Sequence, residues 1–204
     1  MTQPLNYFKE TPSQTAGPYV HIGCTPNFSG VTGVFDEDLG VSMTNDQTEG
    51  HRITVRGMVF DGKGAPLKDA LVEIWQADAK GFYNSPSETR GQADPNFTGW
   101  GRCPGHMESG EFVFDTVKPG MVPFKDGRPM APHITFWIVS RGINVGLHTR
   151  MYFPDEETAN TVDPILTRIE HKTRVPTLIA RKEGDDYRFD IHLQGDNETV
   201  FFDI

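Results

Sequence analysis

The stretch HITFWIVS at residues 133–140 decides the fold of this chain of 204 residues. Its side chains are apolar at nearly every position, so an extended segment would have two apolar faces. Such a run is typical of a strand at the centre of a sheet that is covered on both sides. Its mainly apolar part, ITFWIV, is far too short to cross a membrane as a helix. We therefore expect residues 133–140 to form the central strand of a β-sandwich.

Shorter segments on both sides of this strand alternate between apolar and polar residues, which is the period of a half-buried strand. They lie at residues 53–59, 70–76, 110–117, 145–153, 187–193 and, less regularly, 199–202. Glycine and proline turns separate them; Asp163 followed by Pro164 begins the clearest helix signal, and a second short helix is expected near Asp155. Residues 51–204 are therefore predicted to form a mainly β, antiparallel β-sandwich with one or two short helices.

The first fifty residues predict a long irregular N-terminal arm, because prolines and glycines interrupt every local period. The arm nevertheless carries more large apolar side chains than a solvated tail would, among them Tyr19, Ile22, Phe28, Val34 and Phe35. We therefore expect residues 1–50 to pack on another surface, of this chain or of a partner chain.

Composition excludes several functional classes. A formal charge of −9 would repel a phosphate backbone, so we expect neither nucleic acid nor an anionic membrane as a partner. Cys24 and Cys103 form no C-x-x-C pair, which favours free thiols over a disulfide or a metal cluster. Since the first residues, MTQPLNYFKE, also lack the features of a secretory leader, we expect a soluble cytoplasmic protein.

Catalytic motifs are missing from the sequence. Two histidines at positions i and i+2 of a strand would face the same side and could bind a metal, but His133 is followed two positions later by Thr135. There is no nucleophile elbow, no phosphate-binding glycine loop and no H-E-x-x-H motif. The residues by themselves therefore do not predict an enzyme, and His133 alone is more typical of a hydrogen-bonded strand histidine than of a ligand.

Several segments together nevertheless resemble the intradiol aromatic-ring dioxygenases. They are TPSQTAGPYVHIG from Thr11, ALVEIWQADAKGFY from Ala70, GRCPGHMESGEFVFDTVKPG from Gly101, MAPHITFWIVSRGINVGLHTRMYF from Met130 and YRFDIHLQGDNETVFFDI from Tyr187. The resemblance implies a β-sandwich enzyme in which two tyrosinates and two histidines hold ferric iron, and in which O2 is inserted between the adjacent hydroxylated carbons of the substrate.

The resemblance also implies that this chain has lost its metal ligands. The family's H-I-H-F strand stands here as His133-Ile134-Thr135-Phe136, one tyrosine position falls on Val122, and the other falls near Thr89. The arginine that precedes the histidines falls on Met130, or on nearby Arg128. Val122 and Thr89 cannot replace two phenolates, which a ferric ion needs to offset its charge. We therefore expect no catalytic residue, metal ligand or cofactor in this chain, with Fe(III) held by a homologous catalytic β subunit in an α/β hetero-oligomer.

The resemblance further implies that the chain takes part in binding a small aromatic carboxylate. By position in the family, the arm residues Thr15, Gly17, Pro18 and Tyr19 help to line the partner's pocket, and Arg141 lies close to the substrate. A guanidinium suits an aromatic carboxylate, although a strand-end arginine in solvent is the ordinary alternative.

Two other hypotheses stay open at this point. In the first, the chain is itself a metalloenzyme with an altered site that uses His133 with Tyr83 or Tyr152. In the second, the chain is a free-standing sandwich module that binds aromatic molecules or a protein without catalysis.

Overall fold

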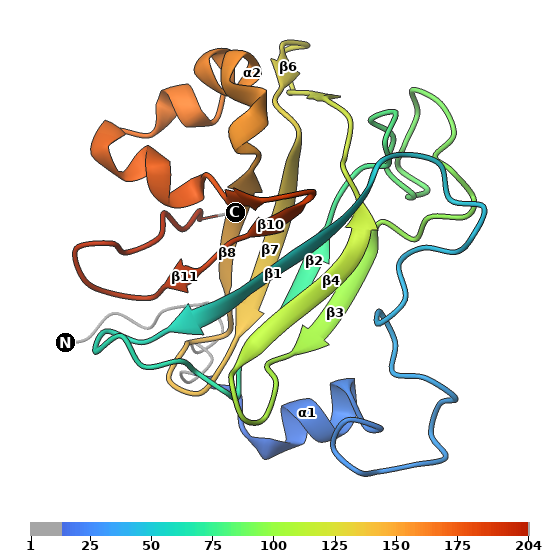
Figure 1. Ribbon diagram of the computed structural model, residues 1–204, viewed down its shortest axis with the longest axis vertical. Helices are drawn as coiled ribbons and strands as arrows, with labels where there is room; N and C mark the ends of the chain where they lie inside the picture. Colours follow the sequence, from blue (N-terminus) through green and yellow to red (C-terminus); the bar gives the residue numbers. More distant parts are fainter. Residues whose placement is uncertain (1–13, 204) are drawn as a thin grey trace, which may run out of the picture.

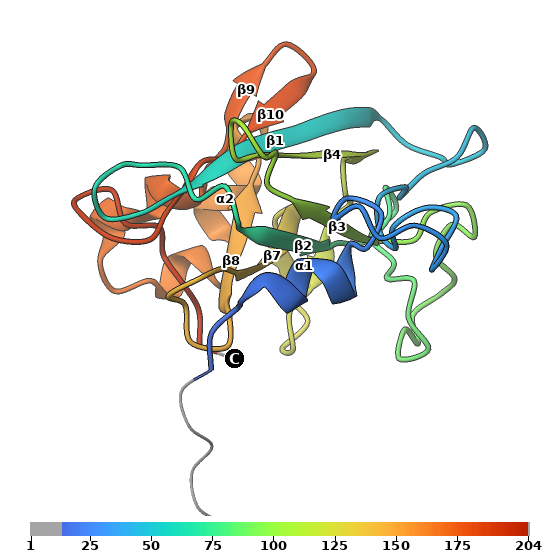
Figure 2. The same cartoon turned by 90° about the horizontal axis from the view of Figure 1, so that it is seen from below.

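Two facing sheets form the body of the protein, as Figures 1 and 2 show. The computed structural model describes residues 14–203, so residues 1–13 of the predicted arm lie outside the described residues. One sheet has the order β3 (Trp100–Pro104), β2 (Leu71–Trp75), β7 (His133–Val139) and β8 (Leu147–Tyr152), and all its pairs are antiparallel. The other has the order β11 (Ile191–His192), β1 (Arg52–Phe60), β10 (Asp186–Arg188) and β9 (Arg181–Glu183), with β4 (Glu111–Val117) also paired to β1. The mainly β, sandwich-like fold predicted from the sequence is confirmed.

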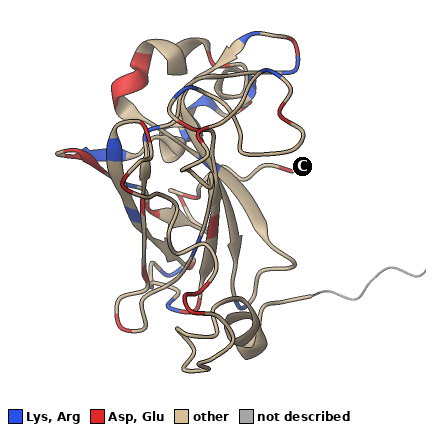
Figure 3. Cartoon of the chain, turned by 90° about the vertical axis from the view of Figure 1, so that its right-hand side faces the viewer, with Lys and Arg blue, Asp and Glu red and all other residues tan. Residues whose placement is uncertain are grey.

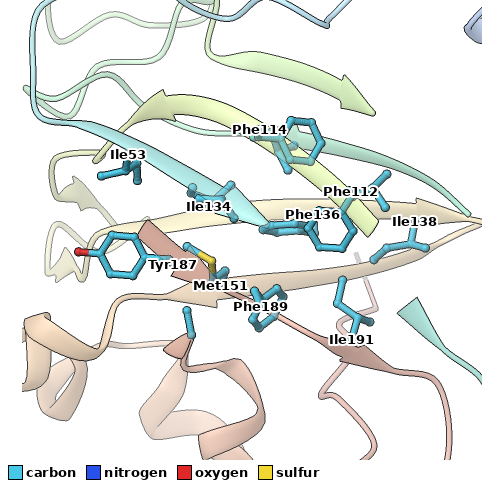
Figure 4. Close-up of a cluster of buried hydrophobic side chains, with 14 of the residues drawn as sticks. Ile53, Phe112, Phe114, Ile134, Phe136, Ile138, Met151, Tyr187, Phe189 and Ile191 are labelled. Carbon is cyan, nitrogen blue, oxygen red and sulfur yellow. The ribbon is translucent and has the colours of Figure 1, made fainter. Parts of the chain in front are cut away.

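The core lies between the sheets and is built by alternation along β7. Ile134, Phe136 and Ile138 point inward and are fully buried. Phe136 packs against Phe112 of β4 and against Phe189, with ring centroids 5.9 and 5.2 Å apart, and Figure 4 shows these side chains together. The opposite side chains of β7 are only half-buried after His133, so the strand has one core face and one partly open face instead of two covered faces.

The second sheet is not wholly antiparallel, because β10 and β11 run parallel to β1. The segment predicted as one strand at residues 187–193 is split between them, since the ladder to β1 is interrupted. At the break, the backbone N–H of Met58 donates to the carboxylate of Asp190 at 3.1 Å instead of to a backbone carbonyl. After β8, the helical turns between residues 154 and 178 lead into β9, and the antiparallel β9–β10 hairpin then reverses the chain so that β10 runs in the same direction as β1.

Short helices occur within the predicted irregular arm, near Asp155 and after Asp163. The arm contains α1 (Pro18–Cys24), whose first residue is Pro18. The fixed φ angle of proline suits the first position of a helix. Near Asp155, η1 (Pro154–Glu156) leads into α2 (Glu157–Val162) as expected. After Asp163 there are only the 3₁₀ turns η2 (Leu166–Arg168) and η3 (Lys172–Leu178).

The buried carboxylate of Asp163 caps the turn that replaces the predicted helix. It accepts hydrogen bonds from the N–H groups of Ile165, Leu166 and Ala131, which ties the turn to another segment. Residues 199–202 form no strand; the N–H of Phe202 makes a single bond to the carbonyl of His148 at 2.8 Å. Within residues 14–203, none of the helices is long and apolar enough to span a membrane.

The hairpin of β5 (Val122–Pro123) and β6 (Pro129–Met130) lies at one end of β7, and α1 lies at the other (Figure 1). Arg102 of β3 donates to the carbonyl of Cys24 at 3.2 Å, which ties the end of α1 to the partly open side of the β7 sheet. The β5–β6 hairpin and α1 are therefore separated by the length of β7.

Candidate functional site

A small pocket lies where β7 ends and the arm meets the loop that follows it. Its lining contains Gly17 and Pro18 from the arm and Arg141 from the loop, and its volume is about 180 Å³. Ala16, His21 and Asp69 complete the lining. We call these six residues the arm pocket.

Backbone and side-chain bonds fasten the arm to the loop after β7. Thr15 forms a β-bridge with Asn144, and its hydroxyl accepts a hydrogen bond from the N–H of Gly142 at 2.9 Å. The neighbouring Gln14 accepts from the N–H of Val145 at 3.1 Å and donates its own N–H to the side chain of Asn144 at 2.8 Å. These bonds place the arm beside Arg141, which is distant from it in sequence.

Arg141 is the charged group of the arm pocket. Its Nε lies 3.4 Å from the Oδ2 atom of Asp69, and its side chain is 77% exposed. The hydroxyl of Ser140 also donates to Asp69, at 3.4 Å. Burial lowers the pKa of His21, and the nearby Asp69 carboxylate opposes this shift only in part. The pocket can therefore offer a carboxylate ligand one guanidinium, which Asp69 holds in place and partly neutralises.

The structure brings together most of the substrate-binding residues predicted from the sequence. Gly17, Pro18 and Arg141 line the arm pocket, while Thr15 fastens the arm beside it. Tyr19 does not line the pocket and is 85% exposed.

Sequence reasoning did not predict His21 and Asp69 as members of this pocket. His21 lies within the quoted arm motif, four residues after Gly17, which was the available signal. Asp69 has no local signal, since only tertiary contact brings it to Arg141.

At the other end of β7 lie the four positions at or near which the sequence resemblance predicts the family's metal ligands, which we call the relict positions: Thr89, Val122, His133 and Thr135. Thr89 and Val122 line a second pocket of about 320 Å³, together with Trp75 and Tyr83. Thr135 is paired across the sheet with Trp75 on one side and with Arg150 on the other, so the strand positions adjoin this pocket.

His133 is buried and its ring is held by the backbone. Its Nδ1 lies 2.7 Å from the carbonyl oxygen of Ala131, which can only accept, so Nδ1 carries the proton. Burial, followed by the nearby charge of Arg150, lowers the pKa of His133 to about 4. The side chain is therefore a neutral imidazole at pH 7.

The two tyrosines proposed for an altered metal site lie close by but favour the protonated phenol. The rings of His133 and Tyr152 are 5.6 Å apart. Burial raises the pKa of both Tyr83 and Tyr152, and Arg150 opposes this rise only partly. Among the residues that the structure describes, no group of three or more histidine, cysteine or acidic side chains could hold a metal ion.

The relict positions do not fit a ferric ion. They provide one neutral imidazole, two neutral hydroxyls and the apolar side chain of Val122, which packs with Ala77 and Met130. A trivalent ion requires anionic oxygen donors, and none of these four side chains supplies one at neutral pH.

The fold and these two regions define the class of the protein. A family described as Dioxygenase matches residues 24–195, and the chain therefore belongs to this family, the iron-dependent intradiol dioxygenases. The dioxygenase domain of a carbohydrate-binding fusion from Streptomyces sp. SirexAA-E has a similar structure, with a TM-score of 0.54 and 25% identity, over 94% of this chain and 100% of that chain. The fold of 3-chlorocatechol 1,2-dioxygenase from Rhodococcus opacus 1CP is also similar, with a TM-score of 0.56 and 22% identity, over 74% of this chain and 62% of that chain.

Two relatives show which enzyme of this family the chain resembles in sequence. The chain is 43% identical over 205 residues to the protocatechuate 3,4-dioxygenase alpha chain of Pseudomonas putida, covering 98% of this chain and 100% of the relative. It is 37% identical over 180 residues to the protocatechuate 3,4-dioxygenase beta chain of Burkholderia cepacia, covering 82% of this chain and 75% of the relative. Both kinds of chain in that enzyme are thus similar to this one.

Proposed function

We propose that this chain is the α subunit of a protocatechuate 3,4-dioxygenase and that it acts together with a homologous β subunit that holds the ferric iron. The pair would cleave protocatechuate with O2 between its two hydroxylated carbons, giving 3-carboxy-cis,cis-muconate for aromatic catabolism. The α chain would contribute the arm pocket to the partner's active site and would be inactive alone. The near full-length similarity to alpha chains and the similarity to a beta chain support this proposal.

The observation that carries the proposal is the distance between Arg141 and the relict positions. Thr135 and Arg141 are six residues apart along β7 and its continuation, and a strand rises about 3.3 Å per residue, so the two ends lie roughly 20 Å apart. A single aromatic ring with a carboxylate cannot span that distance. A substrate that contacts Arg141 therefore cannot reach the relict positions of this chain at the same time, which supports a partner chain as the holder of the ring.

The chemistry of the relict positions supports the assignment of the iron to the partner. They lack anionic oxygen donors, whereas the surface-exposed Arg141 retains the charge needed for the carboxylate of the substrate. In the proposed complex the α chain orients the substrate and closes the pocket, and the partner supplies the metal.

Exposed apolar residues of the arm support a role for residues 1–50 in packing on the partner. The described part of the arm exposes large apolar side chains at Tyr19, Ile22, Val31, Val34, Phe35, Leu39 and Val41. A hydrophobic segment of this kind is typical of a surface that another protein covers. On the side seen in Figure 3, basic and acidic residues are interspersed, and the formal charge of −9 favours neither nucleic acid nor an anionic membrane as the partner. The proposal places the complex in the cytoplasm, where the free thiols of Cys24 and Cys103 would stay reduced.

Co-expression with a homologue that keeps both tyrosines and the His-x-His strand tests the proposal. We expect the two chains to co-elute in size-exclusion chromatography, with one iron per pair and with the visible absorption of ferric tyrosinate. Ring cleavage, measured as O2 uptake with protocatechuate, should require both chains.

A partner variant that lacks one of its tyrosine ligands is the matched control, because it should lose the absorption while still binding this chain. If this chain purified alone with iron and the tyrosinate colour, the altered metalloenzyme would be correct instead. A failure of the two chains to associate would favour the free-standing binding module.

A further inference from the structure

One side of β7 and β8 gathers four polar side chains at the relict end of the sheet. His133 and Thr135 are two residues apart, so they face the same side of the strand. His133 is paired with Tyr152, and Thr135 is paired with Arg150 on β8. Because paired residues of neighbouring strands share a face, all four side chains lie on the side that faces away from the core residues Ile134 and Phe136.

The guanidinium of Arg150 contacts Met130 and lies over the ring of Phe202. Its Nη1 lies 3.6 Å from the sulfur of Met130, which is paired with the relict position Val122 in the β5–β6 hairpin. Its Cζ lies 5.9 Å from the centroid of the Phe202 ring, so the residue is enclosed from the side of the C-terminal segment as well. Two relict positions on different elements, Val122 and Thr135, thus adjoin the same half-buried arginine.

The charge of Arg150 acts on groups from different segments of the chain. It contributes to the lowered pKa of His133, after burial, and opposes the rise in the pKa of Tyr83 and of Tyr152. The contacts with Met130 and Phe202 and the half-buried side chain agree with this position beside the relict end of the sheet.

A buried carboxylate balances this charge. The hydroxyl of Tyr152 donates to Oδ1 of Asp163 at 3.3 Å, and Asp163 is fully buried. The charge of Arg150 also acts on the phenol of Tyr152, where it opposes the rise in pKa that burial causes. The phenol of Tyr152 therefore interacts with both a cation and a carboxylate, and a second pair of opposite charges, Glu88 and Arg90, lines the pocket of Thr89 and Val122.

We propose that the guanidinium of Arg150 takes the place of the metal cation in this chain, and that it would exclude a metal even if the lost ligands were restored. The inference rests on the proposed function for the identity of the relict positions. Loss of donors and occupation by a fixed cation are then two separate barriers to metal binding. A multivalent cation brought to the relict positions would meet a like charge that is half-buried and poorly screened by salt.

Restoring the ligands with and without Arg150 tests this proposal. The first variant is Thr89→Tyr, Val122→Tyr and Thr135→His together, and the second adds Arg150→Gln. We expect the second to bind ferric iron at least roughly tenfold more tightly than the first, because a unit charge at contact distance has an effect of that size or greater. Binding is followed by the visible absorption of ferric tyrosinate and by iron analysis after gel filtration.

The matched control adds Arg181→Gln to the restored variant in place of Arg150→Gln. Arg181 has the same charge, is 68% exposed and lies in the opposite sheet, so its removal should leave iron binding unchanged. Equal affinity with and without Arg150 would overturn the proposal. Iron bound by the unmodified chain would instead overturn the proposed function, so the two failures are distinguishable.

A smaller change keeps the test decisive if the restored variants do not fold. Thr135→His alone recreates two imidazoles on one face of β7, and cobalt(II) is then the probe, followed by calorimetry and visible spectroscopy. We expect Thr135→His with Arg150→Gln to bind cobalt(II) at least roughly tenfold more tightly than Thr135→His alone. Equal affinities, or no binding by either variant, would overturn the proposal.

Discussion

Replacing Arg141 by alanine in the assembled enzyme should weaken the use of protocatechuate without disturbing assembly. The side chain lies at the rim of the arm pocket, is 77% exposed and has Asp69 as its ion-pair partner at 3.4 Å. Its removal deletes a cation and leaves the fold of β7 and the core unchanged.

The expected magnitude follows from this geometry. A hydrogen bond to a charged group contributes about 1.5–3 kcal/mol when it is protected from water. Solvent screening and competition from Asp69 move Arg141 to the lower end, about 1.5 kcal/mol, which corresponds to a loss of roughly tenfold in kcat/KM. Because the guanidinium would contact the carboxylate and not the reacting carbons, most of the loss should appear in KM.

The assay is steady-state O2 uptake by the purified α/β complex, with protocatechuate and with catechol, which lacks the carboxylate. Alanine at position 141 should impair the use of protocatechuate and leave the use of catechol almost unchanged, and Arg141→Lys should lie between alanine and the wild type. Arg181→Gln, which removes an exposed arginine in the opposite sheet, is the control. Unchanged KM for protocatechuate, or equal losses for both substrates, would refute the assignment of Arg141 to the carboxylate.

Two further predictions concern stability. Burial disfavours the charge of Asp155, but hydrogen bonds from lysines and from the hydroxyl of Tyr187 lower its pKa. The ionised carboxylate therefore stabilises the fold above pH 4. This contribution is lost as the pH falls through the lowered pKa. Asp155→Asn should therefore lower the free energy of unfolding at pH 7 by about 1–3 kcal/mol, with a smaller difference from the wild type in urea titrations at pH 3; a constant difference would contradict this. A Cβ added at Gly57 would lie 1.9 Å from the carbonyl oxygen of Phe189, whereas one at Gly23 meets nothing within 4 Å. Gly57→Ala should thus lower Tm by well over 5 °C, as a backbone shift costing several kcal/mol implies, while Gly23→Ala should leave Tm nearly unchanged; similar Tm values for both would show that the strands separate easily at this point.

The strands that line the core were predictable from the sequence because their signal is local. Side chains that alternate along residues 53–59 and 110–117 face the core wherever these segments are extended, and both segments became strands of one sheet. The short arm helix was not predicted, since its seven residues carry no buried side chain that would give a helical period.

Other features depended on contacts between distant segments. The 187–193 segment alternates perfectly in sequence, yet it breaks into β10 and β11 because Asp190 replaces a backbone acceptor for Met58. Asp69 and Arg150 looked like ordinary charged residues, and only tertiary pairing places Asp69 beside Arg141 and Arg150 opposite Thr135.

The sequence by itself determined the chemistry that the relict positions can offer, because Thr89, Val122 and Thr135 lack anionic donors in any conformation. It also determined the sandwich, since a period of two requires a sheet with a core face. Only the tertiary structure decided that the arm and Asp69 meet Arg141, and that Arg150 lies opposite Thr135 and beside Met130, the cross-strand neighbour of Val122. Distances between residues far apart in sequence follow from strand pairing, which depends on the packing of the whole chain and leaves no local trace in the sequence.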